Sequence, residues 1–247
     1  MSESVEHYIK QRIEEKGAIQ MTLIDPQKTG IEDCTEIAVE AEKGGTSAIM
    51  VGGSTLASNA VLDKAIQDIK ARVKVPIILF PNNISGVSRY ADAIWFMSLL
   101  NSANIYYIIG VQALTAHVVR KYGLEAIPMG YIIVGDGGAA GFVGQARGIP
   151  YDHPELALGY SLAAETLGMR FVYLEAGSGA KSHVPLEMIR LVKSQITVPL
   201  LVGGGIRDGA NAKAVVEAGA DIVVTGTLVE NTSGIRESIY DIVSHIE

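Results

Sequence analysis

The sequence predicts an α/β fold, a (β/α)8 barrel of the TIM type in which eight strands alternate with helices. Its 247 residues fit one such barrel, which typically needs about 250. Short apolar runs alternate with helical segments along the chain, as expected for a parallel sheet with right-handed crossovers. No linker or break in composition interrupts this alternation, so we expect residues 1–247 to form a single barrel domain.

The first part of the chain predicts an extra N-terminal helix and three strands. The opening helix is charged and amphipathic, unlike a secretion signal. Pro26 ends the first strand because proline cannot continue a ladder, and Gly44-Gly45 suit the end of a helix. The predicted helices are 3–16, 29–43 and 55–71, and the predicted strands are 18–24, 47–51 and 76–80.

The rest of the chain supplies five further strands. We predict strands at 105–109, 126–134, 171–174, 198–202 and 221–224, and helices at 85–100, 113–122, 154–167, 185–195 and 233–246. One more helix begins at Gly209, where Asp208 is placed to cap it. The glycine-rich segment 135–150 is long for a barrel loop, so it is either a mobile lid or a surface excursion.

Glycines follow the last two predicted strands. Gly203, Gly204 and Gly205 close the seventh strand, and Gly226 with Thr227 closes the eighth. Without a Cβ, glycine lets backbone N–H groups approach an anion, and barrels often bind phosphate in these two loops. The pattern favours a phosphate cradle; the alternative is that these glycines only form tight turns.

Composition excludes several classes of function. The net charge of −7 and the absence of a basic run argue against nucleic acid as a partner. The single cysteine, Cys34, rules out an internal disulfide and fits a cytoplasmic protein. Residues 93–119 carry no formal charge, but Asn101, Ser102 and Gln112 interrupt them, so we expect no transmembrane segment.

Polar residues at strand ends are the candidates for chemistry, because active sites of this fold lie there. Asp25 and Ser54 end neighbouring strands, and a carboxylate with a hydroxyl suits Mg²⁺; the alternative for Asp25 is a helix cap. Glu175 is the best candidate for a catalytic base. Its alternative role is a salt bridge to Lys181 or Arg207.

Six motifs together resemble one family. They are LIDPQK (23–28), VGGST (51–55), FPNN (80–83), FMSLLNS (96–102), YLEAGSGA (173–180) and VGGGIRD (202–208). In this order they are similar to the geranylgeranylglyceryl phosphate synthase family, prenyltransferases of archaeal-type membrane lipid synthesis. The resemblance covers nearly the whole chain and implies a barrel modified around its third helix.

The resemblance also implies substrates and site residues. The substrates are sn-glycerol 1-phosphate, whose C3 hydroxyl forms an ether bond, and geranylgeranyl diphosphate. Asp25 and Ser54 match the family's Mg²⁺ positions. The glycerol phosphate site is matched by Tyr173, Leu174, Glu175, Ala176, Gly177, Ser178, Gly179, Gly204, Gly205, Gly226 and Thr227.

A C20 chain needs a long apolar groove beside the barrel mouth. Trp95, Phe96, Met129 and Tyr131 are candidates to line it, with core packing as their alternative role. Aromatic positions around Trp95 are also candidates for a subunit contact. We expect a homo-oligomer, and transient contact with a membrane surface for product release.

Three alternatives remain at this stage. A phosphosugar isomerase barrel shares the glycine-rich ends, but it needs carboxylates on strands one and five, and strand 126–134 has none. A non-catalytic phosphate-binding barrel would not need Asp25, Ser54 and Glu175 together. A related synthase for a longer prenyl diphosphate differs only in the depth of its groove.

Overall fold

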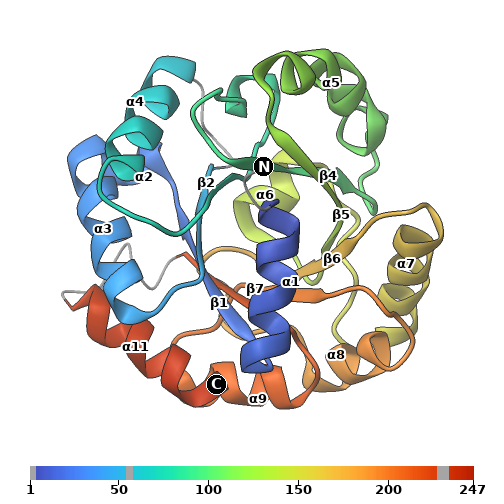
Figure 1. Cartoon of the computed structure of the whole chain (residues 1–247). Helices are drawn as coiled ribbons and strands as arrows, with labels where there is room; N and C mark the ends of the chain where they lie inside the picture. The colour runs from blue at the N-terminus through green and yellow to red at the C-terminus, as the bar shows by residue number, and fades with distance from the viewer. Residues whose placement is uncertain (1–3, 54–57, 227–233) are drawn as a thin grey trace.

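The computed structural model describes residues 4–53, 58–226 and 234–247. Eight parallel strands pair in sequence order, and the last pairs with the first to close a barrel. Figure 1 shows the strands at the centre and the helices around them. The strands are β1 (Ile19–Ile24), β2 (Ala48–Val51), β3 (Ile77–Leu79), β4 (Ala93–Leu99), β5 (Glu125–Ile133), β6 (Phe171–Glu175), β7 (Leu200–Gly203) and β8 (Ile222–Thr225). The predicted barrel is confirmed.

The described helices lie mostly on the outside of this barrel. They are α1 (Val5–Lys16), α2 (Pro26–Thr29), α3 (Ile31–Gly44), α4 (Asn59–Lys70), α5 (Val111–Tyr122), α6 (Gly138–Val143), α7 (Pro154–Thr166), α8 (Leu186–Lys193), α9 (Gly209–Glu217) and α11 (Ile235–Ile246). A 3-10 turn, η1 (Ile84–Gly86), and a π-helical turn, η2 (Tyr106–Gly110), complete them. Asp208 caps α9 as predicted, accepting a hydrogen bond from Asn211 N at 2.7 Å.

The extra helix α1 lies across the amino ends of the strands, in front of the barrel in Figure 1. The carboxylate of Glu125, the first residue of β5, accepts hydrogen bonds from Val5 N at 2.6 Å and Glu6 N at 2.9 Å. Ile9 is fully buried and packs with the side chains inside the barrel. The first helix is therefore an integral part of the fold.

The predicted helix at 85–100 is wrong, because β4 occupies its second half. Its apolar run is buried on both faces: Trp95 points into the barrel, whereas Ile94 and Phe96 face outward. Trp95 packs against Phe171 with ring centroids 5.1 Å apart. A strand buried on both faces has no alternation in its sequence, so its periodicity does not distinguish it from a buried helix.

The predicted fourth strand at 105–109 is also wrong, since the π-helical turn η2 lies there. With β4 already paired to both β3 and β5, the sheet has no place for another strand. Between β3 and β4, the fully described segment 80–92 contains only η1. A barrel modified around its third helix, as the family resemblance implies, is confirmed.

Candidate active site

Glu175 lies at the carboxyl end of β6 and is 6% exposed. Its Oε2 accepts a hydrogen bond from the Tyr173 hydroxyl at 2.6 Å, and its Oε1 accepts one from Gly177 N at 2.6 Å. Residues two apart on a strand share a face, so Tyr173 supports the carboxylate from below, inside the barrel. Arg207 instead donates to the carbonyl oxygen of Ala180 at 3.1 Å. Two fixed donors hold the carboxylate in one orientation.

Burial sets the protonation behaviour of this pair. Burial raises the pKa of Glu175 above its ordinary value, and the hydrogen bonds from Tyr173 and Gly177 oppose that rise. The pKa of the Tyr173 phenol is well above its ordinary value, through burial first and then through the charge of Glu175. Tyr173 therefore remains a proton donor, and Glu175 is a stronger base than an exposed carboxylate.

Gly204 brings the loop after β7 against this carboxylate. A Cβ on Gly204 would lie 2.6 Å from Gly177 N and 2.7 Å from Glu175 Oε1, and its φ is +82°. A Cβ on Gly205, with φ +72°, would lie 2.3 Å from the backbone of Ser182. Within the described residues, the N–H groups of Gly204 and Gly205 donate to no protein acceptor. They are available to an anion, as a phosphate cradle requires.

The other predicted substrate residues contribute in different ways. Leu174 and Ala176 are buried between the sheet and the outer helices, and Ala176 N donates to Gly203 O at 3.0 Å. Their side chains therefore face away from the cradle. Three more predicted positions, Ser178, Gly179 and Gly226, lie in loops that follow β6 and β8. Thr227 lies outside the described residues.

Asp25 lies at the carboxyl end of β1 and is 5% exposed. Its Oδ1 accepts a hydrogen bond from Gln27 N at 3.0 Å, so its alternative role as the cap of α2 is confirmed. The carboxylate also covers the end of β2, because a Cβ on Gly53 would lie 2.1 Å from Asp25 Oδ2. Ser54 lies outside the described residues, among which no group of three or more His, Cys, Asp or Glu side chains is placed to hold a metal.

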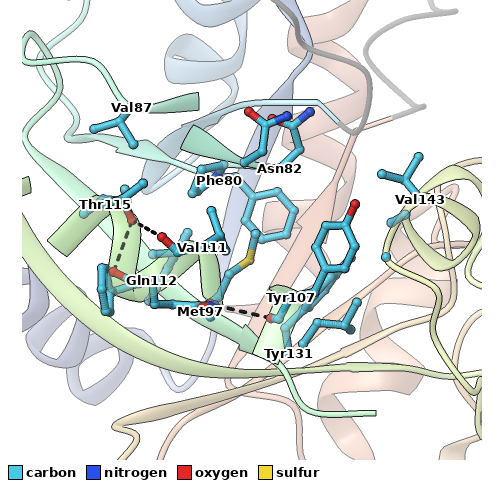
Figure 2. Close-up of a pocket in the computed structure, with 18 of the residues that line it drawn as sticks. Phe80, Asn82, Val87, Met97, Tyr107, Val111, Gln112, Thr115, Tyr131 and Val143 are labelled. Carbon is cyan, nitrogen blue, oxygen red and sulfur yellow. Dashed lines mark hydrogen bonds between the residues drawn. The ribbon is translucent and has the colours of Figure 1, made fainter. Parts of the chain in front are cut away.

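An apolar groove begins beside Asp25 and continues outward. Gly53 and Phe80 line its inner part, and Val87, Val111 and Thr115 line the part between β4 and α5. Figure 2 shows Phe80 and Met97 at the middle of the groove, with Val143 of α6 on the opposite side from Thr115. The groove occupies the region where a regular barrel has its third helix.

The sequence identified part of this groove. Of its four candidates, Trp95, Phe96 and Tyr131 line the groove, whereas Met129 is buried in the barrel core. Trp95 itself is fully buried, and a subunit contact through the aromatic positions around it stays a prediction. The sequence missed the residues from the loop after β3, from α5 and from α6, because their approach to one another depends on the position of β4, which was predicted as a helix. They are Pro81, Asn82, Asn83, Val87, Val111, Gln112, Thr115, Ala140, Val143 and Gly144.

Three aromatic rings join the groove to the carboxylate. The ring of Tyr131 lies 5.5 Å from that of Phe80 and 5.2 Å from that of Tyr173, between centroids. Because Tyr173 also donates to Glu175, the inner end of the groove and the base share one packed cluster. A ligand chain in the groove would therefore end close to Glu175.

The fold and the site define a (β/α)8 barrel in which a buried carboxylate lies between a glycine-lined anion site and an apolar groove. A family model described as the PcrB family matches residues 10–246. The chain therefore belongs to the PcrB family.

Named relatives agree with this assignment. The chain is 54% identical to geranylgeranylglyceryl phosphate synthase of Methanothermobacter thermautotrophicus over 97% of each chain. It is 52% identical to the synthase of Thermofilum pendens over 97% of this chain and 93% of the relative. The resemblance to geranylgeranylglyceryl phosphate synthases is confirmed.

Solved structures give the same result. The Thermoplasma acidophilum synthase, described in complex with its substrate sn-glycerol-1-phosphate, superposes with a TM-score of 0.95 at 43% identity, covering 100% of this chain and 99% of that one. A thiamine phosphate pyrophosphorylase from Pyrococcus furiosus has a TM-score of 0.59 at 14% identity, over 92% of this chain and 95% of that one, which indicates a shared fold only. Among the described residues, no helix is long and apolar enough to span a membrane.

Proposed function

We propose that this protein transfers the geranylgeranyl group of geranylgeranyl diphosphate to the C3 hydroxyl of sn-glycerol 1-phosphate. The products are geranylgeranylglyceryl phosphate, a precursor of membrane phospholipids, and diphosphate. The observation that carries this proposal is the apolar groove, which starts at Gly53 beside Asp25 and joins the Glu175 cluster through Tyr131. A barrel acting only on small phosphate esters has no use for such a groove.

Glu175 has the position and the basicity for the central step. The bond between C1 of the prenyl chain and the diphosphate oxygen breaks, and its electron pair leaves with the diphosphate. The C3 hydroxyl oxygen of glycerol phosphate forms the new bond to C1, and its proton passes to the carboxylate of Glu175. The hydrogen bonds from Tyr173 and Gly177 fix the direction in which this carboxylate accepts the proton.

The glycines hold the acceptor by position rather than by net charge. Consecutive residues Gly204 and Gly205 adopt positive φ, which turns successive N–H groups toward one concave site. Gly204 also lies against Glu175, so a phosphate held there leaves the other end of the short glycerol unit near the base. Gly226 and Thr227 complete this cradle in the proposal.

The donor set fits Mg²⁺ as the cofactor. Asp25 offers a buried carboxylate at the inner end of the groove, Ser54 a hydroxyl, and the substrate diphosphate supplies further oxygens. When bound, Mg²⁺ supplies positive charge that neutralises the diphosphate leaving group. Gly53 leaves room for the Asp25 carboxylate to extend toward the groove.

The isomerase alternative is less well supported. The structure starts β5 at Glu125, so this strand does carry a carboxylate, contrary to the sequence prediction. Glu125 lies at the amino end, however, and its oxygens cap α1 on the opposite side of the barrel from Glu175. A synthase for a longer prenyl diphosphate remains the nearer alternative, and groove depth distinguishes the two.

The proposal includes the setting of the reaction. We expect a cytoplasmic homo-oligomer that contacts the membrane surface transiently to release its lipid product. Exposed apolar side chains beside the groove support the membrane contact, among them Ile105, Ile109 and Phe142 at 73%, 56% and 87% exposure.

One experiment tests the function. The purified protein is incubated with Mg²⁺, sn-glycerol 1-phosphate and prenyl diphosphates of C10 to C25, and the products are identified by mass spectrometry. We expect an ether-linked product, with the C20 donor preferred. Absence of any ether product, or a clear preference for C25, would overturn the proposal or its chain length, respectively.

A further inference from the structure

The segment 134–149 forms a wall shared by the groove and the cradle. On one side, Ala140, Val143 and Gly144 line the groove. On the other side, Gly137 lies against Gly177. A Cβ added to Gly177 would lie 2.5 Å from the carbonyl carbon of Gly137. We call this segment the shared wall. Its position affects both proposed substrates at once.

Asn101, in the loop after β4, holds both ends of the shared wall. Its Nδ2 donates to Ile133 O at 2.8 Å and to Arg147 O at 2.9 Å, and its Oδ1 accepts from Ile133 N at 3.1 Å. Its backbone oxygen also accepts from Arg147 N at 2.8 Å. Asn101 is 1% exposed, so these bonds have no competition from bulk water.

The same bonds extend to the base. Ile133 pairs with Glu175 in the sheet, and the next residue, Val134, donates its N–H to Glu175 O at 2.8 Å. Asn101 therefore connects the ends of three successive strands, β4, β5 and β6. It is not among the residues lining the groove, so it acts only through its neighbours.

We propose that Asn101 is a positioning residue that sets the shared wall, and through it the prenyl groove and the acceptor cradle. This proposal rests on the proposed function. Two donors and one acceptor are needed at the end of one short side chain, and only an amide of this length supplies them. An aspartate would face two carbonyl oxygens without a donor, and an alanine would leave both carbonyls without this partner.

The test compares two variants that weaken the shared wall with one that does not. Asn101→Ala removes the central amide. Ser102→Ala removes a second hydrogen bond to the shared wall, the one that the Ser102 hydroxyl donates to Gly144 O at 2.6 Å. The control is Thr46→Ala, since Thr46 is also buried and its hydroxyl lies 3.1 Å from Ala48 O at the opposite end of the barrel.

Activity and amide exchange are measured at a temperature where circular dichroism shows each variant fully folded, and thermal stability is measured separately by melting. We expect Asn101→Ala to lower kcat/KM by about ten- to a hundredfold, as a 1 Å misplacement does. We also expect a weaker preference for C20 over C15 donors and faster amide exchange in 134–149. Ser102→Ala should change in the same direction but less, and Thr46→Ala should lose thermal stability alone.

Each outcome is decisive. If folded Asn101→Ala and Ser102→Ala keep the wild-type donor preference and the wild-type exchange in 134–149, the positioning role is wrong. If Asn101→Ala does not fold, Ser102→Ala decides by the same criteria. Failure of the proposed function would appear separately, as a wild-type protein that forms no ether product, whereas amide exchange reports on the shared wall without any turnover.

Discussion

The Tyr173 hydroxyl donates a hydrogen bond of 2.6 Å to Glu175 Oε2, and both residues are buried at the carboxyl end of β6. This bond favours the ionised form of Glu175, which burial disfavours. Tyr173 thus controls the pH at which the proposed base becomes available.

Replacing Tyr173 by Phe should move the acid limb of the pH profile. Burial raises the pKa of Glu175, and hydrogen bonds from Tyr173 and Gly177 lower it. Without the phenol only the bond from Gly177 remains, so this pKa rises further. We expect kcat/KM to reach its plateau at higher pH than in the wild type, with a lower plateau. Steady-state rates from pH 5 to 9 would show this, and an unshifted limb would contradict the coupling.

Replacing Glu175 by Gln should lower the activity without lowering the thermal stability at pH 8. We expect kcat to fall by about 10²- to 10⁴-fold, the usual contribution of a general base. The pKa of Glu175 is higher in the folded protein than in the unfolded chain. Protonated Glu175 therefore contributes to stability below the unfolded-state pKa. This contribution to stability is lost as the pH rises through the folded-state pKa. The variant should therefore melt at or above the wild-type temperature at pH 8, with less advantage near pH 4. Glu187→Gln, at an exposed glutamate on α8, is the control and should change neither quantity.

Replacing Asp25 by Ala should weaken the dependence on Mg²⁺. The substitution removes an N-cap, costing about 1 kcal/mol of stability, and also the proposed metal ligand. Asp208→Ala removes a carboxylate N-cap from α9 without touching the proposed metal site. Titration of activity with Mg²⁺ should show a raised half-saturation concentration for Asp25→Ala only. Equal midpoints in both variants would rule out the metal site.

Replacing Gly204 by Ala should raise the KM for sn-glycerol 1-phosphate. The new Cβ would lie within 2.7 Å of Gly177 N and of Glu175 Oε1, at a φ of +82°. Gly123→Ala is a matched control, because Gly123 has a φ of +71° but open space around the added Cβ. Both variants should lose about 1 kcal/mol of stability from the left-handed backbone, and Gly204→Ala should lose more because its Cβ clashes with Gly177 N. Only Gly204→Ala should bind the acceptor more weakly, measured by calorimetry.

Replacing Val111 by Trp should shorten the preferred donor. Val111 lines the groove between β4 and α5, so a larger side chain there takes the space of the chain end. We expect discrimination against C20, relative to C10, to increase by about 10- to 200-fold, the range for one misfit in an apolar pocket. Ile109→Trp is the control, because Ile109 is 56% exposed on the neighbouring turn. A C20 preference retained by Val111→Trp would place the chain elsewhere.

Most of the barrel was predictable because its strands end in recognisable residues. Pro26 after β1, and the glycines after β2 and β7, mark the carboxyl ends of strands without reference to the fold. The same rule placed Glu175 and Asp25 at strand ends, as the structure has them, since that position does not depend on knowing the neighbouring strands. The glycine loops after β7 and β8 were found in the same way.

The elements in region 85–109 were not predictable, because two apolar runs compete for the same place in the sheet. Ala93–Leu99 and Ile105–Ile109 both suit a strand, and only the register between β3 and β5 determines which one pairs. This region forms one side of the groove, so the lining residues that α5 and α6 add to it could not be assigned from the sequence. The bonds of Asn101 join residues 32 and 46 positions apart, which no local pattern reveals.

The position of α1 determines from which end of the barrel ligands can reach the site. Its side chains Ile9 and Val5 pack into the interior of the barrel, and Glu125 fastens its first turn to the start of β5. Helix α1 therefore closes the amino end of the barrel. Because α1 covers the amino end, we expect the proposed donor and acceptor to reach Glu175, and the product to leave, at the carboxyl end, where Glu175 lies.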